Sequence, residues 1–119
     1  MSQPKQGNYF KLPNEIFNMD LSMGEIAVYA FLMRMEDRKT YTCYPSFKTI
    51  GKALQMSKNT VMKYVRQLEE KELIETERTR VESHDGTLRN GNLMYNILPI
   101  KQAIDAFHRR QLYNYGRKK

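Results

Sequence analysis

The first clear periodicity along the chain follows Ser22. Ser22 and Glu25 match a capping box, in which each side chain accepts a hydrogen bond from the backbone N–H of the other residue. Apolar residues then recur at helical spacing, at Ile26, Tyr29, Ala30 and Met33, with Leu32 beside them. The pattern predicts a helix from about Met23 to Glu36.

Two further helices are predicted between Pro45 and Lys71. Pro45 suits the first turn of a helix, and the apolar residues after it share one face, at Phe47, Ile50, Ala53 and Leu54. Ser57 is a good N-cap for a longer second helix, whose apolar stripe consists of Val61, Tyr64, Val65 and Leu68. About three residues join the two helices, which is the arrangement of a helix-turn-helix.

After Lys71 the pattern changes to that of β-strands. The runs 73–81 and 93–97 alternate in strand fashion, and Pro99 ends the second run. Between them the segment SHDGTLRNGN holds two turn signals, Asp85-Gly86 and Asn90-Gly91. We therefore expect a hairpin with a polar tip. The short run 40–44 is expected to form an edge strand or an extended connector.

The two ends of the chain flank this unit. Residues 1–21 are expected to form an arm packed on the domain, because Tyr9, Phe10 and Leu12 precede Pro13. Residues 99–119 predict an amphipathic helix followed by a basic tail, with a stripe at Ile100, Ala103, Ile104 and Phe107, and with Gln111 and Leu112 as further candidates. This stripe either docks on the first helix or forms a homodimer through residues 100–113.

Composition places the chain among small globular domains. It has 119 residues, of which 40% are apolar, with one Cys and two His. No stretch approaches the roughly 20 apolar residues of a membrane span, and residues 1–11 lack the apolar centre of a secretion signal, so we expect a cytoplasmic protein without membrane contact. A lone Cys43 excludes an internal disulfide, and neither a zinc pattern nor a catalytic or cofactor motif is present. The expectation is no enzyme, no metal and no cofactor.

The charge is concentrated in two segments. Twenty basic and thirteen acidic residues give +7. Residues 46–68 carry five basic side chains and no acid, and residues 101–119 carry six basic side chains and one acid. The other two segments do not add to the positive charge: residues 1–45 have five basic and five acidic side chains, and residues 69–100 have four basic and seven acidic. An acid-free helix-turn-helix indicates a polyanionic partner.

The run from Tyr44 to Ile74 resembles the winged helix-turn-helix domains of bacterial, phage and plasmid DNA-binding proteins, with its pattern YPS…TI…L…S…TV…Y…L…LI. Upstream, YFKLPNEIF…LSMGEIAVYAFLMRM is similar to the N-terminal domain of plasmid replication-initiator proteins. The resemblance implies an α+β, mainly α fold over 22–98, with a three-helix core, a hairpin wing and an additional C-terminal helix. Gln55 departs from the pattern, because such turns often hold Gly. The left-handed conformation would be strained for Gln, so we expect a slightly different turn. Gly51 fits, since a small residue allows the two helices to approach.

The second helix of this pair carries the candidate base-reading residues. Asn59, Lys63 and Arg66 lie opposite the buried stripe, and their side chains can pair with adenine, guanine or phosphate. The first helical turn of a recognition helix usually enters the groove most deeply. The candidates for the helix at 58–71 are Lys58, Asn59, Thr60, Lys63, Arg66 and Gln67, with Lys48 and Lys52 expected on phosphate. Any surface helix has a polar outer face, but the absence of acid from residue 46 to 68 favours DNA contact.

The hairpin gives a second, more ambiguous set. Arg78, Arg80, Arg89, Asn90 and Asn92 could contact phosphate or a minor groove, whereas four acids dilute their charge, at Glu75, Glu77, Glu82 and Asp85. A purely structural hairpin stays an open alternative.

Three functions are compatible with these features. The first is a sequence-specific protein that binds double-stranded DNA and regulates transcription. The second is the DNA-binding module of a plasmid or phage replication initiator. The third is a winged-helix module that binds protein, which the basic recognition face disfavours.

Overall fold

The computed structural model describes residues 8–117 of the chain. Its elements are a 3-10 helix η1 (Asn14–Asn18), α1 (Met23–Met35), β1 (Thr42–Cys43), α2 (Phe47–Leu54), α3 (Lys58–Glu70), β2 (Ile74–Glu82), β3 (Leu88–Ile97) and α4 (Ile100–Arg117). The three predicted helices, the hairpin and the C-terminal helix are therefore all present, and the predicted edge strand is β1.

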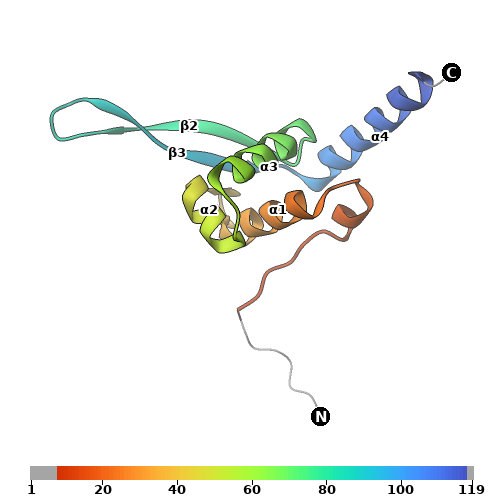
Figure 1. The fold of residues 1–119 in the computed structure, drawn as a ribbon, viewed down its shortest axis with the longest axis horizontal. Helices are drawn as coiled ribbons and strands as arrows, with labels where there is room; N and C mark the ends of the chain where they lie inside the picture. The colour runs from red at the N-terminus through yellow and green to blue at the C-terminus, as the bar shows by residue number, and fades with distance from the viewer. Residues whose placement is uncertain (1–7, 118–119) are drawn as a thin grey trace, which may run out of the picture.

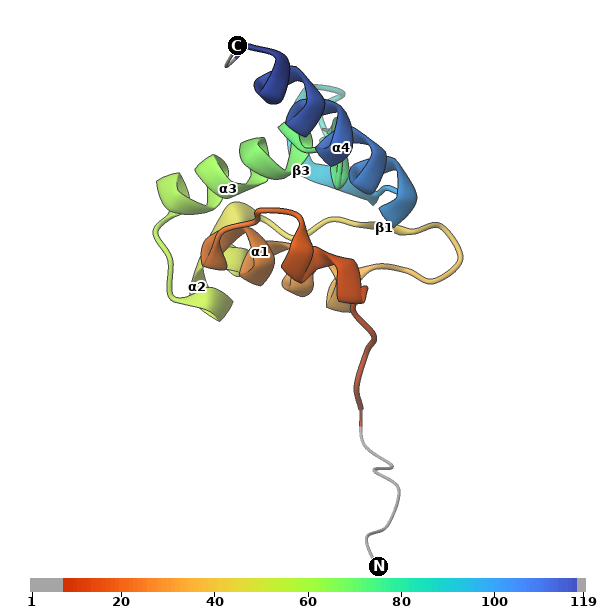
Figure 2. The same ribbon diagram turned by 90° about the vertical axis from the view of Figure 1, so that its right-hand side faces the viewer.

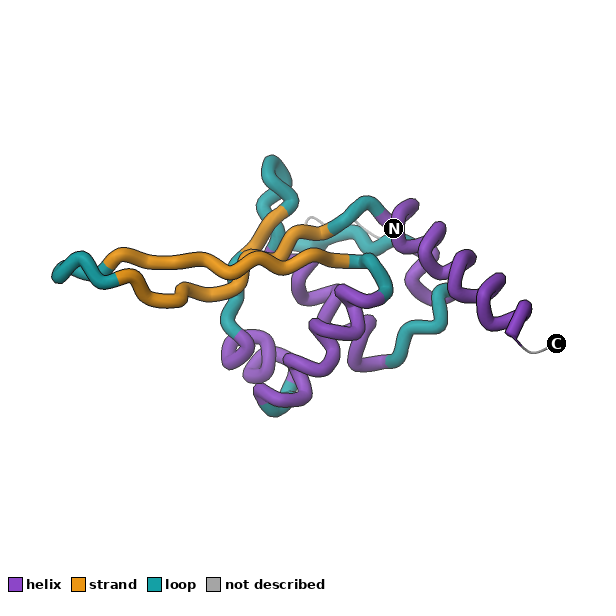
Figure 3. Tube along the Cα trace, turned by 90° about the horizontal axis from the view of Figure 1, so that it is seen from above, coloured by secondary structure: helices purple, strands orange, loops and turns teal. Residues whose placement is uncertain are grey.

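Three helices pack on one face of a small sheet. The sheet is antiparallel with the strand order β1-β3-β2. Helices α1, α2 and α3 lie together on one side of it, as Figure 3 shows from above. The β2–β3 hairpin extends beyond the helices at one end of the molecule, and α4 projects at the other (Figure 1). This is the α+β, mainly helical winged helix-turn-helix expected from the sequence.

The core lies where α1, α2, α3 and the sheet meet. Val28, Leu32, Ile50, Val61 and Leu68 are wholly inaccessible to solvent. On α1 the predicted face was only partly right. Tyr29 and Leu32 are buried as predicted, but Ile26 and Met33 are half-buried, and Val28 and Phe31 are buried although they were not predicted to be. Because α1 is apolar on most sides, its periodicity could not identify the face that is most deeply buried.

Side-chain caps begin the three packed helices. The predicted capping box on α1 is confirmed, with the Ser22 N–H 2.7 Å from Glu25 Oε1 and the Glu25 N–H 3.2 Å from Ser22 Oγ. The predicted cap of α3 is also confirmed, since Ser57 Oγ accepts from the Thr60 N–H. The placement of Pro45 in the first turn of α2 was wrong. Ser46 caps that helix by accepting from the Thr49 N–H, so proline lies just outside it.

The turn between α2 and α3 uses the left-handed conformation in spite of its glutamine. Gln55 has φ 58° and ψ 46°, and its N–H donates to the Gly51 carbonyl. The Met56 N–H donates to the same carbonyl at 2.9 Å. The expectation that glutamine would alter the turn was wrong, because these two hydrogen bonds hold Gln55 in a conformation that usually costs a non-glycine residue about 1–2 kcal/mol.

Gln55→Gly is therefore expected to raise the free energy of unfolding by about 0.5 kcal/mol, since relief of left-handed strain exceeds the entropy that glycine adds to the unfolded chain. Urea unfolding measures the change as a higher midpoint at constant slope. Ala53→Gly is the matched control and should lose about 1 kcal/mol, because Ala53 is exposed on α2 although the apolar pattern had placed it on the packed face. Equal losses in both variants would contradict the strain argument.

The wing is longer than predicted because Asn90-Gly91 is not a turn. Arg78 pairs with Leu93 and Arg80 pairs with Asn90, so Gly91 and Asn92 together oppose the single residue Thr79. This is a β-bulge in β3, and the Thr79 hydroxyl donates to the Asn92 carbonyl across it. Strand pairing then continues to Glu82 and Leu88. The predicted loop 83–92 is thus reduced to a tight turn around Gly86, which has φ 81°.

The chain ends pack unevenly on this core. In the arm, Ile16 and Met19 are buried, whereas Tyr9 is 67% exposed. In α4, Ala103 and Ala106 are buried and Phe107 packs beside the core, but Leu112 is 73% exposed. Gln111 and Leu112 therefore do not continue the buried stripe, because the helix has passed the edge of the domain (Figure 1). Residues 1–7 of the predicted arm, and Lys118 and Lys119 of the predicted tail, lie outside the described residues.

Candidate nucleic-acid interface

The outer face of α3 presents polar side chains over its first three turns. Lys58, Asn59, Lys63 and Arg66 are exposed, and the predicted neighbours Thr60 and Gln67 are half-buried. The Thr60 hydroxyl lies 2.8 Å from Ser57 Oγ, so this side chain is engaged in the cap. The first turn of α3 contains no acid, which leaves the positive end of the helix dipole uncompensated.

Two acids limit this face at the C-terminal end of α3. Glu70 lies seven residues after Lys63, so it falls on the same side of the helix, and both Glu69 and Glu70 are exposed. Glu69 accepts a hydrogen bond from the Thr76 hydroxyl at 2.9 Å. A polyanion would be attracted to the N-terminal half of α3 and repelled from its last turn. The sequence showed that residues 69–100 are acidic, but not that two of these acids belong to the helix with the basic face.

A groove between α2 and the wing gathers cations from both parts of the chain. It has a volume of about 850 Å³ and holds Lys48 and Lys52 from α2, Lys58 from α3, and Arg78 and Asn90 from the wing. The residues that line it include no acid. Arg66 and Arg78 also border a hollow between α3 and β2, which Glu69 lines as well, so the basic surface extends along the base of the wing only as far as this acid.

Strand alternation separates the charges of the wing by face. Ile74 is buried against the helices, so Thr76, Arg78 and Arg80 share its face of β2, while Glu75 and Glu77 lie on the other. Asn90 pairs with Arg80 and therefore lies on the helix side as well. Two of the four acidic residues of the hairpin thus face away from α3, which the sequence alone did not reveal. The side chain of Arg89 lies outside the described part.

The tip of the wing is acidic. Asp85 accepts hydrogen bonds from the Ser83 hydroxyl and from the Thr87 N–H. These bonds lower the pKa of Asp85 to about 2, so this carboxylate is ionised at physiological pH. Glu82 lies near it, on the same face as Arg80. The basic groups of the wing are therefore at its base and middle.

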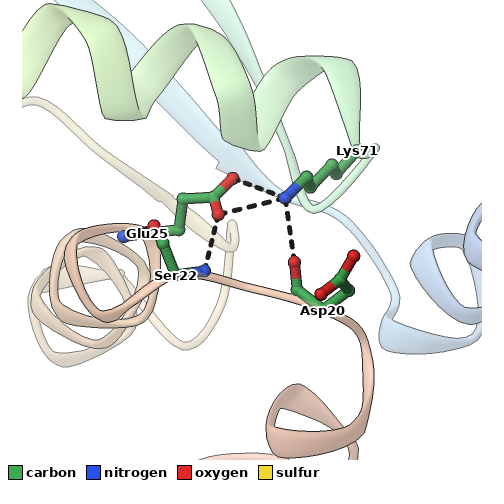
Figure 4. A network of polar contacts seen from close by, with 4 residues as sticks. All are labelled: Asp20, Ser22, Glu25 and Lys71. Carbon is green, nitrogen blue, oxygen red and sulfur yellow. Dashed lines mark hydrogen bonds and ion pairs between the residues drawn. The ribbon is translucent and has the colours of Figure 1, made fainter.

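A buried ion pair holds α1 against the C-terminal end of α3. Glu25 is 2% exposed, and Lys71 Nζ lies 3.0 and 2.9 Å from its two carboxylate oxygens and 3.1 Å from the Asp20 carbonyl (Figure 4). Burial alone would raise the pKa of Glu25, but hydrogen bonds from Ser22 and Lys71 outweigh it and lower the pKa below its ordinary value. Glu25 thus completes the capping box of α1 and also holds the C-terminal end of α3 in place.

The described part of the chain contains neither a candidate metal site nor a candidate membrane-spanning helix. Within residues 8–117 no group of His, Cys, Asp and Glu side chains could hold a metal ion. None of the helices described there is long and apolar enough to cross a membrane.

Comparison with known proteins agrees with this geometry. Residues 20–74 match a family model described as a helix-turn-helix domain. That segment contains α1, α2 and α3 and ends at the first residue of β2. No curated protein matches the sequence.

A solved structure extends the similarity beyond residues 20–74. The chain is similar to a structure titled "Possible transcriptional regulator from Methanosarcina mazei Go1", at 19% identity and a TM-score of 0.53, with 84% of this chain and 78% of the other covered. A second match is a point mutant of S. aureus MepR bound to an oligodeoxyribonucleotide, at 20% identity and a TM-score of 0.49, covering 87% and 66%. The first of these supports the winged helix-turn-helix fold.

The helix-turn-helix domain brings together most of the predicted site. Lys48, Lys58, Arg78 and Asn90 meet at the groove, and Asn59, Lys63 and Arg66 lie on the outer face of α3. Arg80 and the predicted Arg89 lie further along the wing. The sequence did not reveal that Lys71 pairs with Glu25 or that Tyr64 contacts Gly24, although the two residues occupy one side of α3 at a spacing of seven residues. That spacing was a visible signal, although nothing in the sequence paired it with α1.

Proposed function

We propose that the protein binds specific sequences in double-stranded DNA, that it acts as a transcription regulator, and that α3 reads the major groove. The observation that carries this proposal is the exposed basic surface of the N-terminal half of α3 and the groove beside the wing, whose lining residues include no acid. Asn59, Lys63 and Arg66 would read base edges, and Lys48, Lys52 and Lys58 would hold phosphate. On the wing, Arg78, Arg80, Arg89 and Asn90 would add backbone or minor-groove contacts.

The test is selection of bound duplexes from a random library, followed by affinity measurements across a salt series. Lys63→Ala and Arg66→Ala should each weaken binding to the selected site by about 1–3 kcal/mol and relax the base preference at one position of that site. Lys48→Ala should weaken binding to all sequences alike and reduce by about one the slope of log affinity against log salt concentration. Lys39→Ala, an exposed lysine in the turn before β1, is the charge-matched control and should change neither. Binding without sequence preference would reduce the function to general DNA binding.

The role of a replication-initiator module is a second candidate, favoured by the resemblance of YFKLPNEIF and the segment after it to initiator proteins. The two roles differ in the arrangement of sites. An initiator is expected to bind several repeats in a replication origin, whereas a regulator is expected to bind at promoters. Footprinting on both kinds of DNA from the native replicon distinguishes them.

A homodimer through residues 100–113 is proposed as part of either role. Its support is the exposed Leu112 on a helix that projects from the domain (Figure 1). A dimer would place two copies of α3 on half-sites about one helical turn apart, so the selected site should be a palindrome. Leu112→Glu should shift the mass seen in sedimentation from dimer to monomer. A wild-type monomer at the concentrations used for DNA binding would refute this part.

A further inference from the structure

Tyr64 lies on α3 beside the proposed base-reading face, in close contact with the first turn of α1. Gly24 is buried there, and a Cβ atom added to it would lie 2.1 Å from Cζ and 2.2 Å from Cε2 of the Tyr64 ring. Real contacts are never this short, so only glycine at position 24 permits the ring to lie where it does. The Tyr64 ring therefore packs directly against the backbone of the first turn of α1.

A second contact fixes the same two segments. Lys71 follows Tyr64 by seven residues and lies on the same side of α3, and it binds Glu25, the neighbour of Gly24. Two adjacent residues of α1 thus hold α3 at two points that are two helical turns apart. Figure 2 shows α1 running below α3 in the corresponding arrangement. The Glu25–Lys71 pair thus holds the C-terminal end of α3, whereas the contact with Gly24 sets the position of the Tyr64 ring.

The ring in turn contacts the cation at the centre of the outer face. Lys63 Nζ lies 5.3 Å from the Tyr64 ring centroid, within the range of a cation–π interaction. No ion pair involves Lys63 within residues 8–117. The aromatic ring is therefore the group that holds this exposed ammonium toward the α1 side of α3.

We propose that Tyr64 is a positioning residue for Lys63 and that Gly24 is required for this role. The proposal rests on the proposed function of the α3 face. A free lysine loses side-chain entropy when it is immobilised at an interface. A lysine already held over an aromatic ring loses less, and it approaches the DNA from one defined side. Tyr64 thus acts on DNA affinity and base preference through Lys63, without touching DNA itself.

A double-mutant cycle on the selected DNA site tests the proposal. Tyr64→Leu should weaken binding about two- to five-fold, the equivalent of one exposed cation–π contact. The same substitution in a Lys63→Ala background should have no further effect, because the side chain that it positions is gone. Tyr64→Phe keeps the ring and should bind as the wild type does. Base preference at the position that Lys63 reads should broaden in Tyr64→Leu and stay unchanged in Tyr64→Phe.

Two further measurements separate positioning from a general effect on folding. Lys71→Met disturbs the neighbouring contact between α1 and α3 but leaves the Lys63–Tyr64 pair, so it should lower stability without changing base preference. Without DNA, the Lys63 Hε proton resonances should show an upfield ring-current shift in the wild type and Tyr64→Phe that Tyr64→Leu abolishes. All affinities are measured where circular dichroism shows every variant folded.

The outcomes are distinct. Equal weakening by Tyr64→Leu in both Lys63 backgrounds, or the absence of a ring-current shift, would overturn the positioning role while leaving the proposed function intact. If Lys63→Ala leaves DNA binding unchanged, the proposed function of this face fails, and the inference falls with it.

Discussion

Lys71→Met is expected to lower the free energy of unfolding by about 2–3 kcal/mol at neutral pH, because it leaves the buried Glu25 carboxylate without its counter-ion. The methionine keeps the apolar stem of lysine, so the loss reports the missing ammonium and its contacts with Glu25 and the Asp20 carbonyl. The value is below that of a fully buried pair, since the Lys71 side chain is 26% exposed. Chemical unfolding monitored by circular dichroism gives the difference directly.

The pH dependence of this loss identifies its cause. In the wild type the pKa of Glu25 is below its ordinary value of 4.5, so its stabilising effect is complete above about pH 4.5 and declines as the pH falls through the lowered pKa. Without Lys71, only the Ser22 hydrogen bonds oppose the effect of burial, so the pKa of Glu25 should rise relative to the wild type and acid should cost the variant less stability. The difference in stability between the two proteins should therefore narrow as the pH falls through the pKa that Glu25 has in the variant.

The matched control removes both charges. Glu25→Gln/Lys71→Met keeps a residue that can complete the capping box and leaves no buried charge, so it should recover most of the lost stability. A gap that is independent of pH, or a double variant as unstable as Lys71→Met alone, would show that the ion pair is not the source.

Most of the fold could be predicted because local signals in this chain agree with its packing. The Ser22–Glu25 box and the Ser57 cap mark the first residues of α1 and α3, and the apolar stripes of α2 and α3 point at the core that they form. The signals failed where one residue pair can serve two backbone roles. Asn90-Gly91 is as suitable for a bulge as for a turn, and only pairing with Thr79 on the neighbouring strand decides between them.

The candidate site was predictable residue by residue but not as a surface. The helical period identified Asn59, Lys63 and Arg66 as outward-facing on α3. It could not show that Arg78 from the wing lies at the same groove as Lys48, because that proximity depends on tertiary packing. The sorting of Glu75 and Glu77 onto the far face of the wing depends on strand register in the same way. Contacts between segments distant in sequence leave little trace in local patterns.

The arrangement of the helix-turn-helix depends on a single close approach. An alanine Cβ at position 51 would lie 2.5 Å from the backbone carbonyl oxygen of Met56 and 3.5 Å from a Val61 methyl group. The carbonyl belongs to the short turn that enters α3, so it cannot move without displacing Ser57 and the helix that this residue caps. Glycine at 51 is therefore what sets the spacing of α2 and α3.

Gly51→Ala is expected to lower the free energy of unfolding by about 2 kcal/mol, because overpacking against backbone outweighs the gain of about 1 kcal/mol in helix propensity. It should also weaken DNA binding at least ten-fold in the folded protein, since Lys58, Asn59 and Lys63 move with α3. Gly116→Ala makes the same change in a helix where nothing lies within 4 Å of the new methyl group, and it should be neutral or slightly stabilising. Equal behaviour of the two alanine variants would mean that the turn yields to the methyl group, and that the spacing of α2 and α3 has another cause.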